Sequence, residues 1–206
     1  MMTRLSPGRI VRGGLRRLAR RTPMNIFWAP AASVDPKGPP GYSLVRITRS
    51  GASAADRALA EDVMRVAGEP AGLVGARLDD GDEMFGWVYR DQIVSFSWVT
   101  RHDRYVGPVR LADIPGRVFP YNAFTRDEHR GRGLYPAALL AIRSALGREG
   151  ATQFVSDIHE RNAQSAKGCE KAGFVPVARV AFLTIFSTWR LPLERTVSAD
   201  GVGQIF

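Results

Sequence analysis

The chain has 206 residues, enough for one domain with a sizeable core and one or two additional segments. With 45% hydrophobic and 24% charged residues, its composition is that of a soluble globular protein and excludes a wholly disordered chain. A single cysteine excludes an internal disulfide framework, and no apolar run approaches the roughly 18 residues of a membrane span.

The net charge of +9 is unevenly distributed along the chain. The first 40 residues carry eight basic side chains against one acidic one, so seven of the nine net positive charges lie there. The rest of the chain is nearly neutral, which argues against nucleic-acid binding by a folded body. No apolar segment of the length found in secretory signals follows the basic residues, so we expect a cytoplasmic protein.

We expect residues 1–40 to lie outside the folded domain, and residues 41–206 to form it. Residues 1–22 predict a basic, weakly amphipathic helix, and residues 29–41, rich in proline and glycine, predict an extended linker. Four interpretations of the basic segment stay open. They are peripheral contact of residues 4–21 with an anionic membrane, nucleic-acid binding, a poorly ordered tail, and a true start at a later methionine.

From Tyr42 onward, the hydrophobic pattern alternates between strand and helix periods. The predicted strands are 43–49, 84–89, 92–100, 117–125, 152–158 and 174–192, the last being one long strand or two. The predicted helices are 53–68, a weaker 71–78, one that begins between 133 and 136, and 162–173. Pro120 predicts a bulge or irregular pairing in its strand. This order predicts a mixed α/β fold with a mostly antiparallel central sheet flanked by helices.

Alternating aromatic residues occupy the two strands 84–89 and 92–100. We expect most of them to be core residues and part of them to line an acceptor pocket. They are Phe85, Trp87, Tyr89, Phe96 and Trp98.

The segment DEHRGRGLYPAALLAIRSAL, residues 127–146, predicts a bare, basic turn that opens into a helix. Gly131 and Gly133 leave the backbone uncovered, and the first N–H groups of a helix have no partner within it. Together with Arg130 and Arg132 they form an anion site suited to a diphosphate. The alternative is an ordinary basic surface turn. The GxxxxGK[ST] pattern is absent, and GxGxxG fails because Pro136 stands where its last glycine should be.

Two motifs together resemble the cofactor-binding motifs of the GCN5-related N-acetyltransferase (GNAT) superfamily. Arg130 and Gly133 match (Q/R)-x-x-G-x-(G/A), although Tyr135 stands at the last, usually small position. In the second motif, Asn162 is followed by Gly173-Phe174. The resemblance covers about residues 42–190 and is strongest over 121–175.

The resemblance implies a GNAT-like acyl-CoA-binding fold, with acetyl-CoA or another acyl-CoA as co-substrate and no metal. The backbone amides of the turn would hold the pyrophosphate, and the strand end would pair with the pantetheine arm. The side-chain amide of Asn162 and the helix after it would complete the cofactor site. Lys171 is either a candidate ligand of the 3′-phosphate or a solvated helix residue. The implied cofactor residues are Phe124, Thr125, Arg130, Gly131, Arg132, Gly133, Leu134, Tyr135, Asn162 and Ser165.

The implied activity is transfer of an acyl group, expected to be acetyl, to an amine of a small molecule or sugar. A base must first deprotonate the amine, and the candidates are Tyr121, Asp157 and His159. The family often has a tyrosine seven residues after the motif asparagine, as proton donor to the thiolate; here that position is Cys169. It is either a proton donor or a small core residue.

The amino-sugar expectation rests on the likeness of the turn to that of enzymes acylating sugar amines for cell-surface glycans. The alternative function is a non-catalytic CoA-fold module recruited to a membrane or polyanion by the basic segment. A homodimer is also left open.

Overall fold

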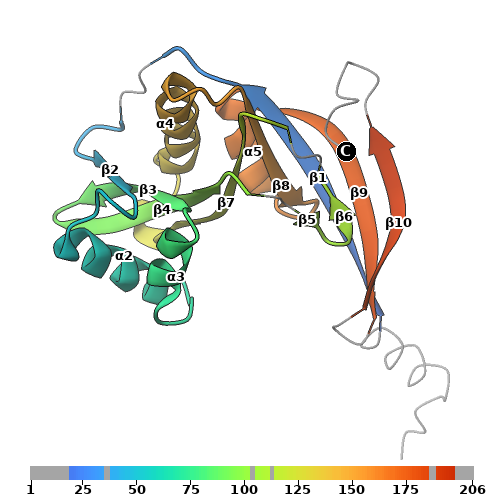
Figure 1. Ribbon diagram of the computed structural model, residues 1–206, viewed down its shortest axis with the longest axis horizontal. Helices are drawn as coiled ribbons and strands as arrows, with labels where there is room; N and C mark the ends of the chain where they lie inside the picture. Colours follow the sequence, from blue (N-terminus) through green and yellow to red (C-terminus); the bar gives the residue numbers. More distant parts are fainter. Residues whose placement is uncertain (1–18, 35–37, 103–104, 112–113, 186–188, 198–206) are drawn as a thin grey trace, which may run out of the picture.

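The computed structural model describes residues 19–34, 38–102, 105–111, 114–185 and 189–197 (Figure 1). Eight described strands form one sheet in the order β10-β9-β1-β8-β7-β4-β3-β2, and only β7 and β8 pair in parallel. A separate hairpin joins β5 to β6. The predicted mixed, mostly antiparallel sheet flanked by helices is confirmed.

The described strands are β1 (Ala19–Pro30), β2 (Ser43–Ile47), β3 (Glu83–Tyr89), β4 (Gln92–Thr100), β5 (Tyr105–Val106), β6 (Val109–Arg110), β7 (Arg117–Thr125), β8 (Gln153–His159), β9 (Val175–Ile185) and β10 (Trp189–Val197). The helices are α2 (Ala54–Val66), α3 (Leu73–Asp79), the short 3-10 helix η1 (Asp127–His129), α4 (Leu134–Arg148) and α5 (Ala163–Lys171).

Strand β1 corrects the expected boundary at residue 40. It lies inside the sheet between β9 and β8, and its residues Ile26, Phe27 and Ala29 are buried. The helix expected over 1–22 is therefore wrong for residues 19–22, and the linker begins only after Pro30. The apolar run of β1, between Pro23 and Pro30, is too short to show a strand period. The position of β1 in the sheet comes from its pairing with β8 and β9, which lie more than 120 residues away in the sequence. Residues 1–18, and with them most of the proposed membrane-contact segment 4–21, lie outside the described residues.

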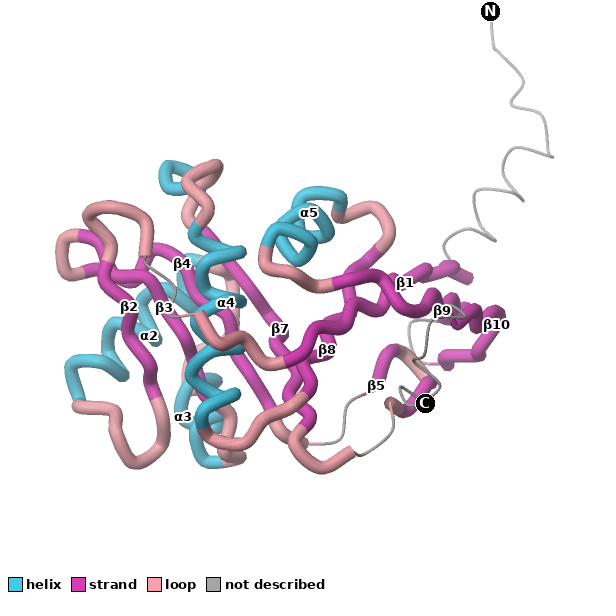
Figure 2. Tube along the Cα trace, turned by 90° about the horizontal axis from the view of Figure 1, so that it is seen from above, coloured by secondary structure: helices cyan, strands magenta, loops and turns pink. Residues whose placement is uncertain are grey.

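The helices cover the two faces of the sheet (Figures 1 and 2). Helices α4 and α5 lie on one face, and α2 and α3 lie on the other. The apolar stripe of α4, Leu139, Ile142 and Leu146, is fully buried against the sheet. Four of the five alternating aromatic residues are core residues, while Tyr89 is half-buried. Within the described residues, no helix combines the length and apolarity needed to cross a membrane.

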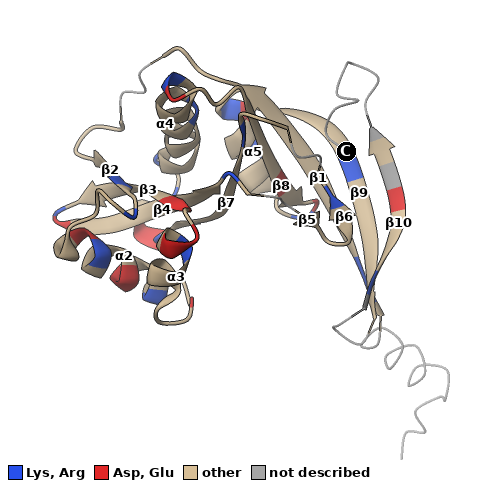
Figure 3. Ribbon diagram, in the orientation of Figure 1, with Lys and Arg blue, Asp and Glu red and all other residues tan. Residues whose placement is uncertain are grey.

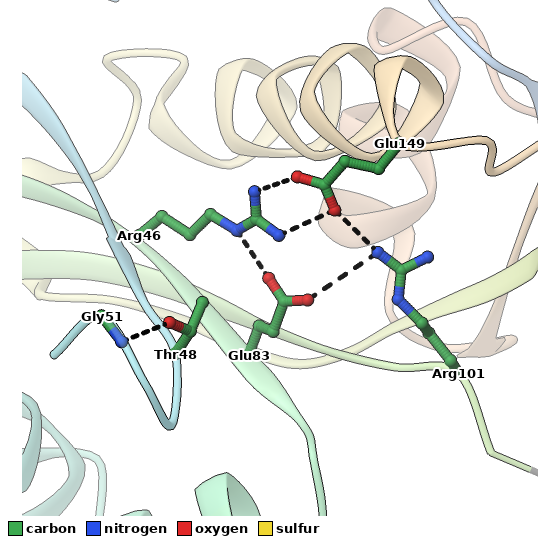
Figure 4. A network of polar contacts seen from close by, with 6 residues as sticks. All are labelled: Arg46, Thr48, Gly51, Glu83, Arg101 and Glu149. Atoms are coloured by element: carbon green, nitrogen blue, oxygen red, sulfur yellow. Dashed lines mark hydrogen bonds and ion pairs between the residues drawn. The ribbon is translucent and has the colours of Figure 1, made fainter.

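Polar contacts fix both ends of α4 on the sheet. At its beginning, the indole N–H of Trp87 donates to the Leu134 carbonyl over 2.9 Å. Just after its last residue, Glu149 joins a four-residue network with Arg46, Glu83 and Arg101 (Figure 4). In it, Arg46 Nε lies 2.6 Å from Glu83, and Arg101 lies 3.0 Å from Glu149. The network therefore joins β2, β3 and the end of β4 to the end of α4.

A buried arginine ties α4 to its other neighbours. Arg143 donates from Nε to the Pro30 carbonyl over 2.7 Å and from Nη1 to the Ala172 carbonyl. Its guanidinium carbon lies 5.5 Å from the ring centre of Phe174. Burial lowers the pKa of Arg143, but two carbonyls and an aromatic ring satisfy the charge. Arg143 thus connects α4 to the end of β1 and to the end of α5.

We predict that Glu149→Gln lowers the free energy of unfolding by about 0.5–1 kcal/mol at neutral pH, since the carboxylate is partly exposed and solvent screens it. The hydrogen bond from Arg46 holds the pKa of Glu149 below its usual range. The carboxylate therefore stabilises the fold above the unfolded-state pKa of about 4.3, and this contribution is lost as the pH falls through the lower folded value.

Urea denaturation of both proteins across that pH range measures the difference. Glu170→Gln is the control, because Glu170 is exposed and forms no ion pair among the described residues. A difference that stays constant down to the lowest pH would contradict the role assigned to the Glu149 charge.

Candidate functional site

The parallel pairing of β7 with β8 is very short. It joins only Arg117 to Gln153 and Val118 to Phe154. The next alternate residue of β7 is Pro120, which has no N–H to donate, and its carbonyl instead accepts from the Ser156 hydroxyl over 3.2 Å. Beyond this point the two strands separate (Figure 2).

A bulge in β7 follows directly. Trp98 of β4 pairs with Tyr121 and Phe96 pairs with Phe124, so Asn122 and Ala123 together face the single residue Ser97. Asn122 has a left-handed backbone, with φ of 44°, and its side-chain amide donates to Glu69 over 2.6 Å. Bulges of this kind bend a strand and interrupt its ladder of hydrogen bonds. The irregular pairing predicted for this strand is confirmed.

The separated strands border a cleft of about 160 Å³. It collects side chains from β7, β8, the start of α4 and the start of α5. Its lining includes three predicted base candidates, Tyr121, Asp157 and His159, and three predicted cofactor residues, Tyr135, Asn162 and Ser165. The other lining residues were not predicted as site residues; they are Ser97, Pro120, Asn122, Ala123, Ser156 and Ile158.

The glycine turn lies at the α4 end of this cleft. Gly131 and Gly133 have φ of 75° and 76°, in the left-handed region that favours glycine. A Cβ on either residue would meet nothing within 4 Å, so the space beside them is open.

The beginning of α4 has no cap. Gly133 makes no side-chain cap, whereas Ser53 and Asp56 cap α2 reciprocally. Among the described residues, no backbone N–H from Gly131 to Tyr135 has an acceptor. These amides and the positive end of the helix dipole form a cradle that can bind an anion.

Two arginines border the cradle. Arg130 donates from Nε to the Thr125 carbonyl over 3.2 Å and pairs with Asp127 over 2.9 Å. Arg132 donates to the Glu128 carbonyl over 3.3 Å. Both side chains are therefore held on the turn, where their charge adds to that of the helix end.

A small aromatic group packs behind the same turn. The Tyr42 hydroxyl lies 2.9 Å from Nδ1 of His129, and the rings of Tyr42, Tyr89 and His129 have centres 5.1–5.8 Å apart. His129 lies within the predicted turn segment 127–146, whereas Tyr42 carried no signal, because its contact with His129 spans 87 residues.

Phe124 and Thr125 lie at the end of β7 and do not line the cleft. The Phe124 carbonyl accepts from the Ser95 hydroxyl over 3.0 Å, and the Thr125 carbonyl accepts from Arg130. Their pairing with a pantetheine arm stays a prediction.

The three base candidates differ in their partners. The Tyr121 hydroxyl donates to Asp82, whose side chain is buried at the start of β3, and the Arg77 guanidinium lies over the Tyr121 ring at 5.1 Å. Nδ1 of His159 accepts the Arg161 N–H over 3.1 Å, which assigns the proton of the neutral ring to Nε2. Asp157 is half-buried on the cleft wall.

Asn162 caps α5, because its side-chain oxygen accepts the Ser165 N–H over 3.1 Å. The side-chain NH₂ of Asn162 is then the group that can donate to a ligand. Asn162 lies at the cleft wall, and its contact with a cofactor stays a prediction.

Cys169, one of the candidate catalytic residues, lies in the core instead of at the cleft. Cys169 is fully buried in the core under α4 and α5 and does not line the cleft. Its sulfur lies 3.4 Å from the hydroxyl of Tyr135, which does line the cleft. Burial raises the pKa of Cys169 to about 11, so the thiol stays protonated at neutral pH. The alternative interpretation as a small core residue is confirmed.

We predict that Cys169 reacts with Ellman's reagent on the order of 100-fold more slowly in the native protein than in urea at pH 8. The folded pKa of about 11 leaves little thiolate, and the side chain has no exposed surface. Because the chain has one cysteine, the thiol signal belongs to Cys169 alone. Equal rates in both states would contradict this burial.

Comparison with known proteins identifies the family. The family model of the acetyltransferase (GNAT) domain matches residues 46–175, more than half of the chain. The chain therefore belongs to the GNAT family. Among proteins with curated functions, no sequence matches it.

Solved structures share the fold at low sequence identity. A putative GNAT-family acetyltransferase from Novosphingobium aromaticivorans has a TM-score of 0.52 and 20% identity over 80% of this chain and 64% of its own. A GNAT-family acetyltransferase from Colwellia psychrerythraea has a TM-score of 0.56 and 11% identity over 87% and 59%. A tandem GNAT protein from the clavulanic acid biosynthesis pathway has a TM-score of 0.52 and 16% identity over 89% and 60%. The chain thus spans less than two thirds of the length of these proteins.

Proposed function

We propose that this protein is an acyl-CoA-dependent N-acyltransferase that transfers acetyl from acetyl-CoA to an amine of a small molecule. The observation that carries the proposal is the cradle of acceptor-free amides at residues 131–135, which adjoins the cleft between β7 and β8. Tyr135 belongs to both, so a diphosphate in the cradle and an extended arm in the cleft can belong to one ligand.

The residues present fit such a ligand. The open space beside Gly131 and Gly133 lets a diphosphate approach the amides, and Arg130 and Arg132 complement its charge. The side-chain amide of Asn162 donates to the pantetheine arm. Acetyl-CoA supplies an acyl carbon activated as a thioester.

The β7 bulge supports a role in activating the carbonyl. A bulge leaves backbone N–H groups outside the strand ladder, and Asn122 and Ala123 border the cleft. Such an N–H, fixed before the reaction, stabilises negative charge on the carbonyl oxygen without reorganisation.

The acceptor amine enters from the face covered by α2 and α3. Tyr121 packs against the core on that face, and Glu69 and Asp82 lie close to it through Asn122 and Tyr121. These carboxylates attract an ammonium group. The amine must lose a proton before it attacks, and Tyr121 accepts it while passing its own proton to Asp82. We favour an amino sugar as the acceptor, because the glycine turn resembles that of enzymes that acylate sugar amines.

No observation favours the alternative of a non-catalytic module. Figure 3 shows acidic and basic residues interspersed over α2 and α3, so these helices present no uniformly basic surface. Residues 1–18 of the basic segment, to which the alternative assigns recruitment, lie outside the described residues. Turnover is tested by thiol release from acetyl-CoA with a panel of amines that includes glucosamine. A panel without any turnover, by a protein that binds acetyl-CoA, would support the non-catalytic module.

We predict that calorimetric titration detects micromolar binding of acetyl-CoA and that Gly133→Asp weakens it by about 100-fold. The substitution places a carboxylate beside the anion cradle, where it repels the diphosphate and competes for backbone donors whose hydrogen bonds to an anion are worth about 1.5–3 kcal/mol each.

Gly72→Asp is a matched control. Gly72 begins α3 with φ of 77°, has no side-chain cap and would also place a Cβ in open space. Gly72→Asp imposes the same backbone strain at a site away from the glycine turn, so the affinity of this variant for acetyl-CoA should equal that of the wild type. Equal loss in both variants, or none in either, would reject the cradle as the diphosphate site.

A further inference from the structure

Two neighbouring residues of β7 both contact carboxylates that lie between α2 and β3 in the sequence. The Tyr121 hydroxyl donates to Asp82, and the Asn122 amide donates to Glu69 over 2.6 Å. In a regular strand, consecutive side chains point to opposite faces of the sheet. Here the bulge and the left-handed backbone of Asn122 let both side chains reach this one segment. Two carboxylates therefore lie directly behind two residues that line the cleft.

Neither carboxylate has a cationic partner among the described residues. Glu69 is half-buried, and its contact with Asn122 is to a neutral amide. Asp82 is 8% exposed, and its Oδ1 has no hydrogen-bond donor within the described part of the chain. Arg77 lies over the Tyr121 ring but pairs with neither carboxylate. Since removing a charge from water without a partner is costly, both positions favour a ligand that brings a positive charge.

The segment that carries these carboxylates is acidic, although the whole chain is basic. Residues 54–82 hold seven acidic and three basic side chains, a net charge of −4, whereas the chain has a net charge of +9. Four of the seven acidic residues form no ion pair in the part of the chain that the structure describes. They are Glu61, Glu69, Asp80 and Asp82. The side of the cleft toward α2 and α3 thus attracts cations, whereas the glycine turn attracts anions.

Glu69 stands apart from the proton path assigned to Tyr121 and Asp82. It lies in the connection between α2 and α3, where its N–H donates to the Met64 carbonyl over 3.0 Å. Its Oε1 accepts from Asn122, and its Oε2 has no hydrogen-bond partner among the described residues. The carboxylate is therefore held in place at both its backbone and its side chain, with one oxygen left for a ligand.

We propose that Glu69 binds a second ammonium group of the acceptor, so that the acceptor class is compounds with two amino groups. The inference rests on the proposed function and narrows its acceptor. One amine is acylated beside Tyr121, while the other stays charged and forms an ion pair with Glu69. A flexible diamine and a diamino sugar both carry this chemistry, and the experiment distinguishes them.

The test compares two matched pairs of acceptors with the wild-type protein, by thiol release from acetyl-CoA. One pair is putrescine and butylamine, and the other is diaminoglucose and glucosamine. Within each pair the members differ by one amino group. A charge-assisted contact with Glu69 should raise kcat/KM for the diamine by about 10-fold or more in at least one pair. The pair that shows the difference tells whether the two amines are joined by a chain or by a sugar.

Two variants assign the preference to Glu69. Glu69→Gln removes the charge but keeps an oxygen for the Asn122 amide, so the ratio of the two kcat/KM values should fall to near one. Asp79→Asn is the matched control, because it removes one charge from the same acidic segment. Asp79 ends α3 and pairs with Arg49 over 3.5 Å, away from the cleft lining, so this variant should keep the wild-type ratio.

Equal kcat/KM values within both pairs in the wild type would overturn the proposal, whether or not either variant folds. A preference that Glu69→Gln retains, or that Asp79→Asn loses to the same extent, would also overturn it, because the charge responsible would then lie elsewhere. Turnover of the monoamines without any preference for diamines would leave the proposed function intact. Absence of turnover with all four amines would reject the proposed function, and this inference with it.

Discussion

The early end of the parallel β7–β8 pairing is the constraint on which the site depends. Two register positions hold the strands together, and Pro120 cannot extend the ladder because it has no N–H. The Ser156 hydroxyl satisfies its carbonyl, so the interruption leaves no buried acceptor without a partner there. The bulge at Asn122 then bends β7. Without these two features the sheet would be continuous and the cleft would not exist.

Helix α4 gives the cleft a charged end, and its position is fixed by contacts at its beginning, along its length and at its end. Trp87 binds its first carbonyl, the network around Glu149 holds its last turn, and Arg143 joins it to β1 and α5. A helix anchored this firmly can leave its first amides without a cap. The free donors are a local cost in stability that the anchors offset, and an anion is the group that would satisfy them.

The cleft has two chemically different walls. On the wall toward α2 and α3, Tyr121 points its proton at a buried carboxylate, which suits the removal of a proton from an acceptor. On the wall toward α4 and α5, burial raises the pKa of Tyr135, so its hydroxyl stays protonated at neutral pH. The two tyrosines thus have different surroundings because the sheet separates them.

Local patterns in the sequence determined much of this protein. The helix that begins at residue 134, the apolar stripe of α4, the uncapped glycine turn and the cap at Asn162 follow from residue spacing and backbone preference. Even the irregularity of β7 could be predicted from Pro120. These features depend on residues within a few positions of one another, where periodicity and turn chemistry carry the signal.

Only the tertiary structure decided the rest. Residues 19–30 form a central strand because β8 and β9 pair with them, although their short apolar run between two prolines has no strand signature. Cys169 looked like a catalytic position by its spacing from Asn162, yet the packing of α4 on α5 buries it and brings Tyr135 to the cleft instead. Which side chain reaches a site depends on contacts between distant segments, such as Tyr135 over Gly168, and a single sequence does not encode these contacts in any local pattern.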